Sequence, residues 1–431
     1  MKNKKIAIVG SGISGLGVAH SLQGQADITL LEAGSYFGGH ANTVDISLPT
    51  ENGLLTYGVD TGFLVFNERT YPNLIKLFEE LGVETALSDM SFSVQAPNAW
   101  GRETLEWSGS NLDTVFAQRR NLGRPKFLKM LLDVVRFNKL CTQIAEQQSE
   151  REMRQPLSEF LKQHGFGDAF KNWYFLPMMG CIWSCPTDQM LAFPVATMIR
   201  FCHNHGLIQV TNRPRWFTVK GGSRNYVEKI VSKIADKRLN TPVQLIERDE
   251  QGVRVITQGH AERFDEVVIC THSDQALRLL REPSPAEVKN LSAIRYQDNV
   301  AVLHTDEKVL PSRRKAWAAW NYARAASDQL ESTRVCLHYL LNKLQPLPYS
   351  QAVVVSLNPT QAIDPEKTIQ TIEYAHPVFD LAAIDAQHNM HLIQGQQHTW
   401  YAGAWLGYGF HEDGLKSGLS AARELLKKVH A

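Results

Sequence analysis

Residues 5–32 read KIAIVGSGISGLGVAHSLQGQADITLLE and contain the strongest structural pattern in the chain. The apolar run 5–9 predicts a buried parallel strand, and the glycine turn 10–15 follows it at once. Residues 16–22 predict a helix, and a second apolar run then predicts another strand, which ends just before Glu32. This order of strand, glycine turn, helix, strand and acid is typical of a Rossmann-like unit that binds a dinucleotide.

The glycines of the turn have separate physical roles. Gly10 permits the tight turn, Gly12 leaves room for a pyrophosphate against the backbone, and Gly15 lets the helix pack on the strand. A helix N-terminus presents free N–H groups and a partial positive charge. The backbone at Ile13 and Ser14 is therefore expected to face the phosphates.

The residues from Glu32 onward indicate which dinucleotide is bound. A carboxylate at Glu32, next to Ala33, can accept hydrogen bonds from ribose hydroxyls and disfavours a 2′-phosphate, which argues against NADP. A second glycine turn, Gly38-Gly39-His40, follows where an NAD-binding unit would normally continue into another helix. Together with the small residues of Val59-Asp60-Thr61-Gly62-Phe63, this second close backbone approach favours a longer, extended cofactor, FAD.

Several separated segments resemble the flavin amine oxidase superfamily, which includes monoamine and polyamine oxidases and, more distantly, phytoene desaturases. The matching segments are Gly10 to Glu32, Gly38-Gly39-His40, the middle segments 219–223, 241–246 and 264–271, and the C-terminal segments 400–404 and 409–414 with the helix 415–429. Because these segments lie at both ends and in the middle of the chain, the resemblance implies the interleaved architecture of that family.

The resemblance also implies particular contacts with FAD. Val243 would contact the adenine through its backbone, Thr271 would be a further contact, and Gly403 and Ala404 would lie near the ribityl chain. The pair His411-Glu412 would start the last helix, whose N-terminus would face the pyrimidine carbonyl of the flavin. A helix N-terminus stabilises the negative charge of a reduced flavin.

The expected fold class is α/β, with a Rossmann-like FAD-binding domain and an interleaved, mixed α+β substrate domain. The expected segments are 1–66, 217–290 and 392–431 for the FAD-binding domain, and 67–216 and 291–391 for the substrate domain. Within the second domain, 71–81 and 127–144 predict amphipathic helices, and 301–304, 335–339 and 352–356 predict strands of a sheet over the flavin.

Departures from the family pattern bear on the reaction. His40 stands where the family usually has Arg, which predicts a weaker or pH-sensitive contact. No cysteine lies near Gly403, so FAD is expected to bind non-covalently. Asn299 aligns where the oxidases keep a lysine near the flavin, and His411 aligns where they often place an aromatic residue.

With both marks of amine oxidation missing, we expect an FAD-dependent oxidoreductase that removes a hydride from an apolar substrate of fatty-acyl or lipid-like character. An amine oxidase that uses oxygen is one alternative. A flavoprotein with a structural or redox-sensing role, serving a partner enzyme, is another. No catalytic residue is assigned; His411 and His304 are the candidate bases.

Two stretches of the expected substrate domain each permit two interpretations. Residues 173–183, WYFLPMMGCIW, predict either buried core or an apolar pocket wall over the flavin. The basic segment 118–126, QRRNLGRPK, precedes an amphipathic helix and predicts either a solvated loop or a peripheral contact with anionic lipid.

Composition limits the remaining classes of partner. Lys and Arg number 45 and Asp and Glu 44, so no global charge indicates nucleic acid. The six cysteines are scattered, which favours a reduced, cytoplasmic compartment, and glycines interrupt the N-terminal apolar run, which argues against a secretory signal. No run approaches the roughly 18 to 20 apolar residues of a membrane-spanning helix. The oligomeric state is not predicted.

Five cysteines and histidines of the expected substrate domain could form a metal or redox site. Its members are Cys181, Cys185, Cys202, His203 and His205. The Cys-x3-Cys and Cys-His-x-His spacings are not those of common zinc sites, so no metal is expected. A redox pair of Cys181 and Cys185 is a minor alternative.

Overall fold

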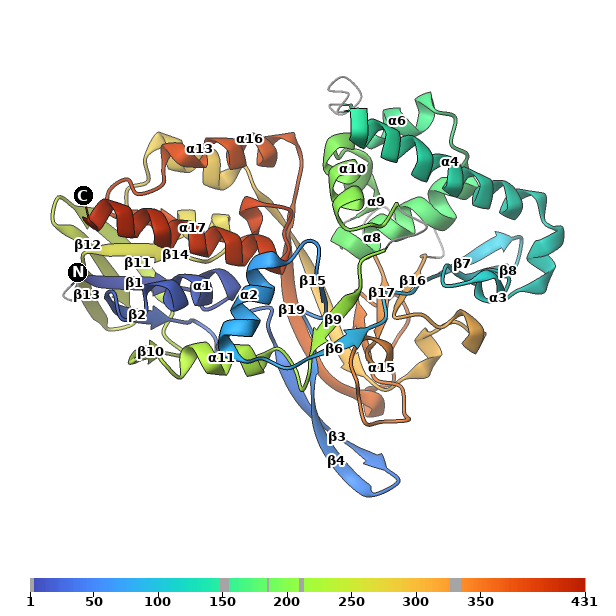
Figure 1. Ribbon diagram of the computed structural model, residues 1–431, viewed down its shortest axis with the longest axis horizontal. Coiled ribbons are helices and arrows are strands. Elements are labelled where there is room, and N and C mark those ends of the chain that lie inside the picture. Colours follow the sequence, from blue (N-terminus) through green and yellow to red (C-terminus); the bar gives the residue numbers. More distant parts are fainter. Residues whose placement is uncertain (1–3, 148–154, 184–185, 209–212, 326–334, 431) are drawn as a thin grey trace.

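The structure, a computed structural model, describes residues 4–147, 155–183, 186–208, 213–325 and 335–430. Figure 1 shows two lobes, with both chain termini in one lobe and a group of helices at the far side of the other. None of the described helices combines the length and the apolar character that crossing a membrane requires.

The first lobe is built on a five-stranded parallel sheet whose strands come from three separate parts of the chain. In spatial order they are β10 (Asp236–Arg238), β2 (Asp27–Leu31), β1 (Lys5–Val9), β14 (Glu266–Ile269) and β20 (Thr399–Tyr401). Ile6 and Ile8 pack with helices α1 (Ile13–Leu22) and α17 (His411–His430), while Ala7 and Val9 pack with the layer on the opposite face. The predicted strand–turn–helix–strand unit is confirmed.

The second lobe is built on a seven-stranded sheet that is antiparallel except at one pairing. In spatial order its strands are β19 (Thr368–Val378), β15 (Arg295–His304), β18 (Val354–Leu357), β17 (Leu337–Leu340), β16 (Trp320–Ala323), β7 (Phe92–Trp100) and β8 (Glu103–Ser108). Only β16 and β7 run parallel. Helices α4 (Pro125–Gln147), α8 (Leu176–Trp183) and α10 (Val195–Asn204) pack on this sheet and form the largest apolar core with it.

Shorter elements complete the fold. The described strands are β3 (Thr43–Thr50), β4 (Gly53–Asp60), β5 (Phe66–Asn67), β6 (Thr85–Ser88), β9 (Trp216–Val219), β11 (Val243–Asp249), β12 (Gly252–Thr257) and β13 (His260–Phe264). The described helices are α2 (Pro72–Leu81), α3 (Leu112–Val115), α6 (Leu157–Gln163), α7 (Asp168–Phe170), α9 (Thr187–Leu191), α11 (Arg224–Val231), α12 (Ser273–Leu279), α13 (Pro285–Ser292), α15 (Leu341–Leu344) and α16 (Leu381–Asn389).

Helix α2 belongs to the core of the first lobe, although the sequence-based boundary at residue 67 puts it in the substrate domain. Its apolar face is buried in the same cluster as α1, α11 and α17. All strands of the parallel sheet otherwise lie in the segments assigned to the FAD-binding domain, and all strands of the seven-stranded sheet in the segments assigned to the substrate domain. The domain boundaries themselves stay a prediction.

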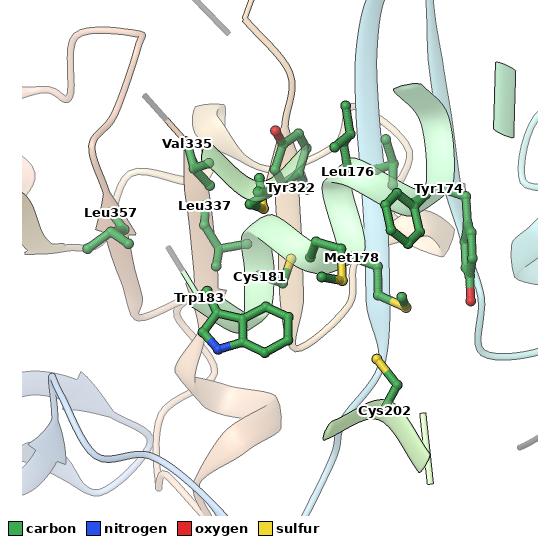
Figure 2. Packing of buried hydrophobic residues seen from close by; sticks show 14 of the residues in the cluster. Tyr174, Leu176, Met178, Cys181, Trp183, Cys202, Tyr322, Val335, Leu337 and Leu357 are labelled. Atoms are coloured by element: carbon green, nitrogen blue, oxygen red, sulfur yellow. The ribbon is translucent and has the colours of Figure 1, made fainter. Parts of the chain in front are cut away.

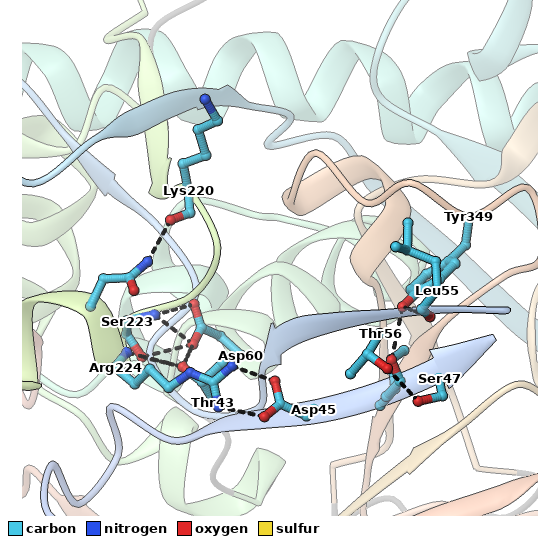
Figure 3. A network of polar contacts seen from close by, with 12 residues as sticks. Thr43, Asp45, Ser47, Leu55, Thr56, Asp60, Lys220, Ser223, Arg224 and Tyr349 are labelled. Atoms are coloured by element: carbon cyan, nitrogen blue, oxygen red, sulfur yellow. Dashed lines mark hydrogen bonds and ion pairs between the residues drawn. The ribbon is translucent and has the colours of Figure 1, made fainter. Parts of the chain in front are cut away.

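Asp60, at the end of β4, links elements of both lobes, and Figure 3 shows its contacts with Thr43 and Ser223. Its carboxylate accepts hydrogen bonds from Thr43 Oγ1 at 2.6 Å, from the backbone N–H of Ser223 at 2.8 Å, and from Gln345 Nε2 at 2.9 Å. Burial raises the pKa of Asp60 to about 6, even though these hydrogen bonds lower it.

We expect Asp60 to make folding stability depend on pH. The pKa of Asp60 in the folded protein lies above its value of 3.8 in the unfolded chain. The stability that the protonated Asp60 contributes is therefore fully present below pH 3.8 and is lost as pH rises through about 6. A shift of two units corresponds to about 3 kcal/mol. Relative to Asp60→Asn, which cannot ionise, the wild type should therefore lose stability between pH 4 and pH 7.

Denaturant unfolding of ligand-free protein across this pH range measures the difference. Asp27→Asn, at an exposed position, is the matched control and should follow the wild type. A stability difference between Asp60→Asn and the wild type that does not vary with pH would contradict the assignment.

Candidate functional site

One continuous cavity of about 730 Å³ lies against both sheets. At one end its walls are the two glycine turns and the loops that follow β14 and β20, and at the other end they are α8, α10 and the second sheet. All but two of the predicted cofactor contacts line it. They are Gly10, Gly12, Ile13, Ser14, Glu32, Ala33, Gly39, His40, Gly62, Phe63, Val243, Thr271, Gly403, Ala404 and His411.

The two glycine turns meet at the backbone. Gly10 has a φ of +99°, which a larger residue would adopt only with strain. A Cβ on Gly39 would lie 3.2 Å from the Cα of Gly12, and the N–H of Gly38 donates a hydrogen bond to Ser11 Oγ at 3.2 Å. A Cβ on Gly12 itself would meet nothing within 4 Å. The turns therefore leave an open cradle over Gly12, which suits a pyrophosphate.

Gly15 and Glu412 are the two predicted contacts that do not line the cavity. A Cβ on Gly15 would overlap the carbonyl oxygen of Gly10, so Gly15 acts by letting α1 pack closely, as its place in the motif implies. The carboxylate of Glu412 accepts hydrogen bonds from the backbone N–H groups of Asn73 and Leu74, both at 3.0 Å. The side chain of Glu412 thus binds the N-terminus of α2 and does not line the cavity, and a contact between Glu412 and the cofactor stays a prediction.

Glu32 organises the first turn from the end of β2. Its carboxylate accepts hydrogen bonds from Ser11 N at 2.9 Å, from Ser11 Oγ at 2.5 Å and from the N–H of Gly34 at 2.8 Å. It is partly buried and lies in the cavity wall, where a ribose would pass. The geometry fits the ribose contact predicted from the sequence.

His40 is neutral and has a free donor or acceptor site. Burial, followed by the charges of neighbouring histidines, holds the pKa of His40 well below its usual value. The ring stacks on Tyr374 with centroids 4.6 Å apart, and its buried Nε2 has no hydrogen-bond partner in the described part of the chain. The sequence predicts a weaker or a pH-sensitive contact between His40 and the cofactor, and a neutral ring favours the weaker contact.

The candidate bases occupy different places. His411, the first residue of α17, lines the cavity; its ring stacks on Phe63 at 3.8 Å, and its Nε2 lies 2.6 Å from the hydroxyl of Tyr226. Burial lowers the pKa of His411 to about 3. His304 does not line the cavity, and its Nε2 contacts Ser356 Oγ at 2.6 Å inside the second sheet. The prediction of His304 as a base is wrong, because its side chain is fully buried away from the site.

Asn299 lies behind the cavity wall. Its amide nitrogen is 2.8 Å from Nδ1 of His376, and His376 itself lines the cavity. Sequence reasoning missed Tyr374 and His376, two wall residues of β19. Since alternate residues of a strand share a face, a strand prediction over 368–378 would have placed these two together.

The far end of the cavity is an apolar chamber. Its wall includes Met90, Phe92, Met178, Cys181, Ile182, Trp183, Phe201, Leu207, Trp320, Tyr339, Leu357 and Phe410. Among all described residues that line the cavity, only Glu32 and Arg278 belong to the charged types, and Arg278 is paired with Asp274 at 2.8 Å. The chamber itself therefore presents no carboxylate and no ammonium group in the described part of the chain.

The aromatic stretch 173–183 serves both of its predicted purposes. Met178, Cys181, Ile182 and Trp183 line the chamber, whereas residues such as Phe175 and Met179 are buried in the core. Figure 2 shows Met178, Cys181 and Trp183 on α8, next to Tyr322, Val335 and Leu337. A helix that is apolar all round can face a core on one side and a cavity on the other.

Among the described members of the cysteine and histidine cluster, no metal-binding group is found. No group of three or more His, Cys, Asp or Glu within the described ranges could hold a metal ion. Burial raises the pKa of Cys202 to about 12, and that of Cys181 well above its usual value, so neither is a reactive thiolate. Cys185 lies outside the described residues, as does any contact that it makes with Cys181.

A dinucleotide cradle joined to an apolar chamber defines a nucleotide-cofactor oxidoreductase. The profile of the flavin containing amine oxidoreductases matches residues 13–336, and the chain belongs to this family. It is therefore a flavin-containing oxidoreductase, and the α/β fold with a Rossmann-like domain and a substrate domain is confirmed.

Solved structures are similar over the whole length. A CLA-producing fatty acid isomerase from P. acnes has a TM-score of 0.68 and 15% identity, with 100% of each chain covered. A cyclohexylamine oxidase from Brevibacterium oxydans has a TM-score of 0.69 and 16% identity, over 99% of this chain and 100% of that one. A putrescine oxidase with bound putrescine has a TM-score of 0.65 and 14% identity, with 99% of each chain covered. At these identities the likeness describes the fold. Among curated proteins no sequence match was found.

Proposed function

We propose that this chain binds FAD non-covalently and removes a hydride from a neutral, apolar, lipid-like substrate. The glycine cradle and α1 would hold the pyrophosphate, Glu32 the ribose, and Gly403 with the start of α17 the flavin end. The bound flavin would supply the hydride acceptor. Cys181 and Cys270 line the cavity, and burial raises the pKa of both thiols, which disfavours a thioether to the cofactor.

The observation that carries the substrate class is the uncharged chamber. A protonated amine loses its hydration on entering such a space. Aromatic rings, which this chamber has, compensate for part of that cost by a cation–π contact of about 0.5–2 kcal/mol, and a carboxylate would be needed for the rest. No carboxylate lines the described chamber. The fold is shared both with a fatty acid isomerase and with amine oxidases, and the chamber favours a substrate chemistry closer to the former. Because burial leaves His411 a weak base, we assign no proton acceptor.

Anaerobic reduction of the flavin tests the proposal. Oxidised holoprotein is mixed with neutral long-chain fatty esters, and separately with primary amines of matched length. We expect the apolar compounds to bleach the flavin absorbance and the amines to leave it. Bleaching by amines, or rapid peroxide formation when reduced protein meets oxygen, would support amine oxidation instead. A flavin that none of these compounds reduces would favour the structural or redox-sensing alternative.

Two indole groups add a polar feature to the chamber. Trp183 and Trp320 both line it, and the buried Nε1 atom of each has no hydrogen-bond partner among the residues that the structure describes. A buried donor without an acceptor is unfavourable, which suggests that an acceptor arrives with the substrate. We propose that an oxygen of an otherwise apolar substrate accepts from at least one of them.

Replacing each indole by phenylalanine tests this contact while keeping an aromatic ring. Trp183→Phe or Trp320→Phe should raise KM for the reducing substrate by roughly fivefold, the effect of losing about 1 kcal/mol. FAD affinity should not change. The control is Trp107→Phe, because that indole donates to the backbone carbonyl of Trp173 at 3.2 Å outside the cavity. Unchanged KM in both chamber variants would contradict the proposed contact.

A further inference from the structure

Helix α4 has an apolar stripe on its outer face as well as on its inner face. Phe127, Met130 and Phe137 are fully buried in the core. Leu128, Leu132 and Val135, spaced at i, i+4 and i+7, are 38%, 71% and 62% exposed. Because this spacing keeps side chains on one face, the three form a continuous apolar line on the surface. A continuous apolar line on the surface indicates an interaction site, whereas single exposed leucines are common on protein surfaces.

Basic residues surround this apolar stripe. Residues 118–140 contain seven Lys or Arg and one Asp, in a chain whose formal net charge is only +1. Lys129, Arg136 and Lys139 are exposed on α4 itself. The single acid, Asp133, is buried and pairs with Arg136 at 3.1 Å. This surface thus carries local positive charge, although three of its arginines are paired with acids, Arg119 with Asp113, Arg124 with Glu103 and Arg136 with Asp133.

The turn before α4 continues the same chemistry. Residues Arg119–Gly123 form a short 3-10 helix that leads into α4, and Leu122 is exposed there among arginines. Arg119 pairs with Asp113, and Arg124 lies over the ring of Trp100 at 4.4 Å, so these heads are held near the surface. The segment combines exposed apolar side chains with anchored cations.

We propose that residues 119–139 bind the surface of a bilayer that contains anionic lipid, with α4 lying in the membrane plane. Leu122, Leu128, Leu132 and Val135 would enter the boundary of the acyl chains, and the flanking lysines and arginines would reach the headgroups. Protein interfaces deplete lysine at their centre, so the same patch fits a protein partner poorly. Anionic lipid lines the cytoplasmic leaflet, in agreement with the compartment predicted from the sequence.

The membrane-binding face and the chamber share one helical layer. The ring of Phe137, on the inner face of α4, contacts Phe175 with centroids 5.3 Å apart, and α8 begins at the next residue, Leu176. Helix α8 then supplies the chamber wall through Met178 and Trp183. Only the link between the membrane contact and the chamber rests on the proposed function, because an apolar substrate accumulates in a bilayer.

Vesicle flotation of oxidised holoprotein, without substrate, tests the membrane contact directly. We expect flotation with phosphatidylcholine vesicles that contain phosphatidylglycerol, weaker flotation at high salt, and little with phosphatidylcholine alone. The double variant Leu132→Gln/Val135→Gln should reduce bound protein at least about tenfold. Lys129→Glu/Lys139→Glu should reduce it comparably and remove the salt dependence. Leu381→Gln, 57% exposed at the start of α16, is the matched control and should float as the wild type does.

Each remaining outcome overturns the proposal. Wild type that stays unbound with anionic vesicles at low salt excludes a membrane contact, as does binding that neither double variant alters. A wild-type dimer that Leu132→Gln/Val135→Gln converts to a monomer would identify the stripe as a contact between two copies. Flavin reduction by dispersed apolar substrates is measured separately, so failure of the membrane contact and failure of the proposed function are distinguished.

Discussion

Gly12→Ala yields a folded protein that no longer holds FAD, whereas Gly15→Ala damages the fold itself. The two glycines lie three residues apart, yet their surroundings are opposite. Gly12 has φ −60° and ψ 175°, which alanine adopts readily, and its Cβ would enter the open cradle. A Cβ on Gly15 would overlap the carbonyl oxygen of Gly10, a backbone atom that cannot rotate away.

The magnitudes of the two effects follow from these surroundings. At the N-cap of α1, Gly12→Ala should cost about 1 kcal/mol or less in the free energy of unfolding. Gly15→Ala should cost about 3 kcal/mol or more, since overpacking against backbone forces α1 away from β1. The added methyl of Gly12→Ala occupies the place of the pyrophosphate, so FAD affinity should fall by at least about 100-fold, which corresponds to roughly 3 kcal/mol.

Unfolding of the cofactor-free proteins and titration with FAD separate the two variants. Gly12→Ala should unfold near the wild type and fail to take up FAD. A Gly12→Ala protein that binds FAD as tightly as the wild type would mean that the cradle does not hold the pyrophosphate. Gly24→Ala serves as a control for the removal of a glycine that has a positive φ, since it should lose some stability and keep its FAD affinity.

The first forty residues were predictable because their signal is local. Strand, turn, helix and acid follow one another within 28 residues of sequence, and each position has its own steric or electrostatic requirement. The surroundings of His40 were not predictable in this way. Tyr374 stacks on it from a strand more than three hundred residues later, and no periodicity near His40 indicates that partner.

For the pair His411-Glu412, the start of the helix was predictable from the local sequence, but the contacts of the two side chains were not. Both residues start the last helix as expected. Adjacent helical residues point about 100° apart, so they cannot share one environment. His411 faces the cavity, and Glu412 reaches the backbone of α2. Which of the two meets the cofactor depends on where α2 packs, and α2 reaches that place through tertiary contacts that the family resemblance does not describe.

Glu32→Ala should abolish tight FAD binding, and Glu32→Gln should retain part of it. The wild-type carboxylate already accepts hydrogen bonds from Ser11 and Gly34, so its removal leaves the turn without an organising acceptor as well as removing the ribose contact. Hydrogen bonds to a charged acceptor contribute about 1.5–3 kcal/mol each. Losing two ribose contacts of this kind corresponds to at least about 100-fold in the dissociation constant.

Glutamine separates the charge of Glu32 from its shape. Its amide oxygen can keep the contact with the N–H of Ser11, but it accepts fewer hydrogen bonds and carries no charge. We therefore expect FAD affinity to follow the order wild type, Glu32→Gln, Glu32→Ala in titrations that monitor flavin absorbance. Glu80→Ala, on the surface beside His20, should match the wild type. A yellow Glu32→Ala protein with wild-type FAD content would show that the ADP end of the cofactor is held elsewhere, and the assignment of the cradle would then fail with it.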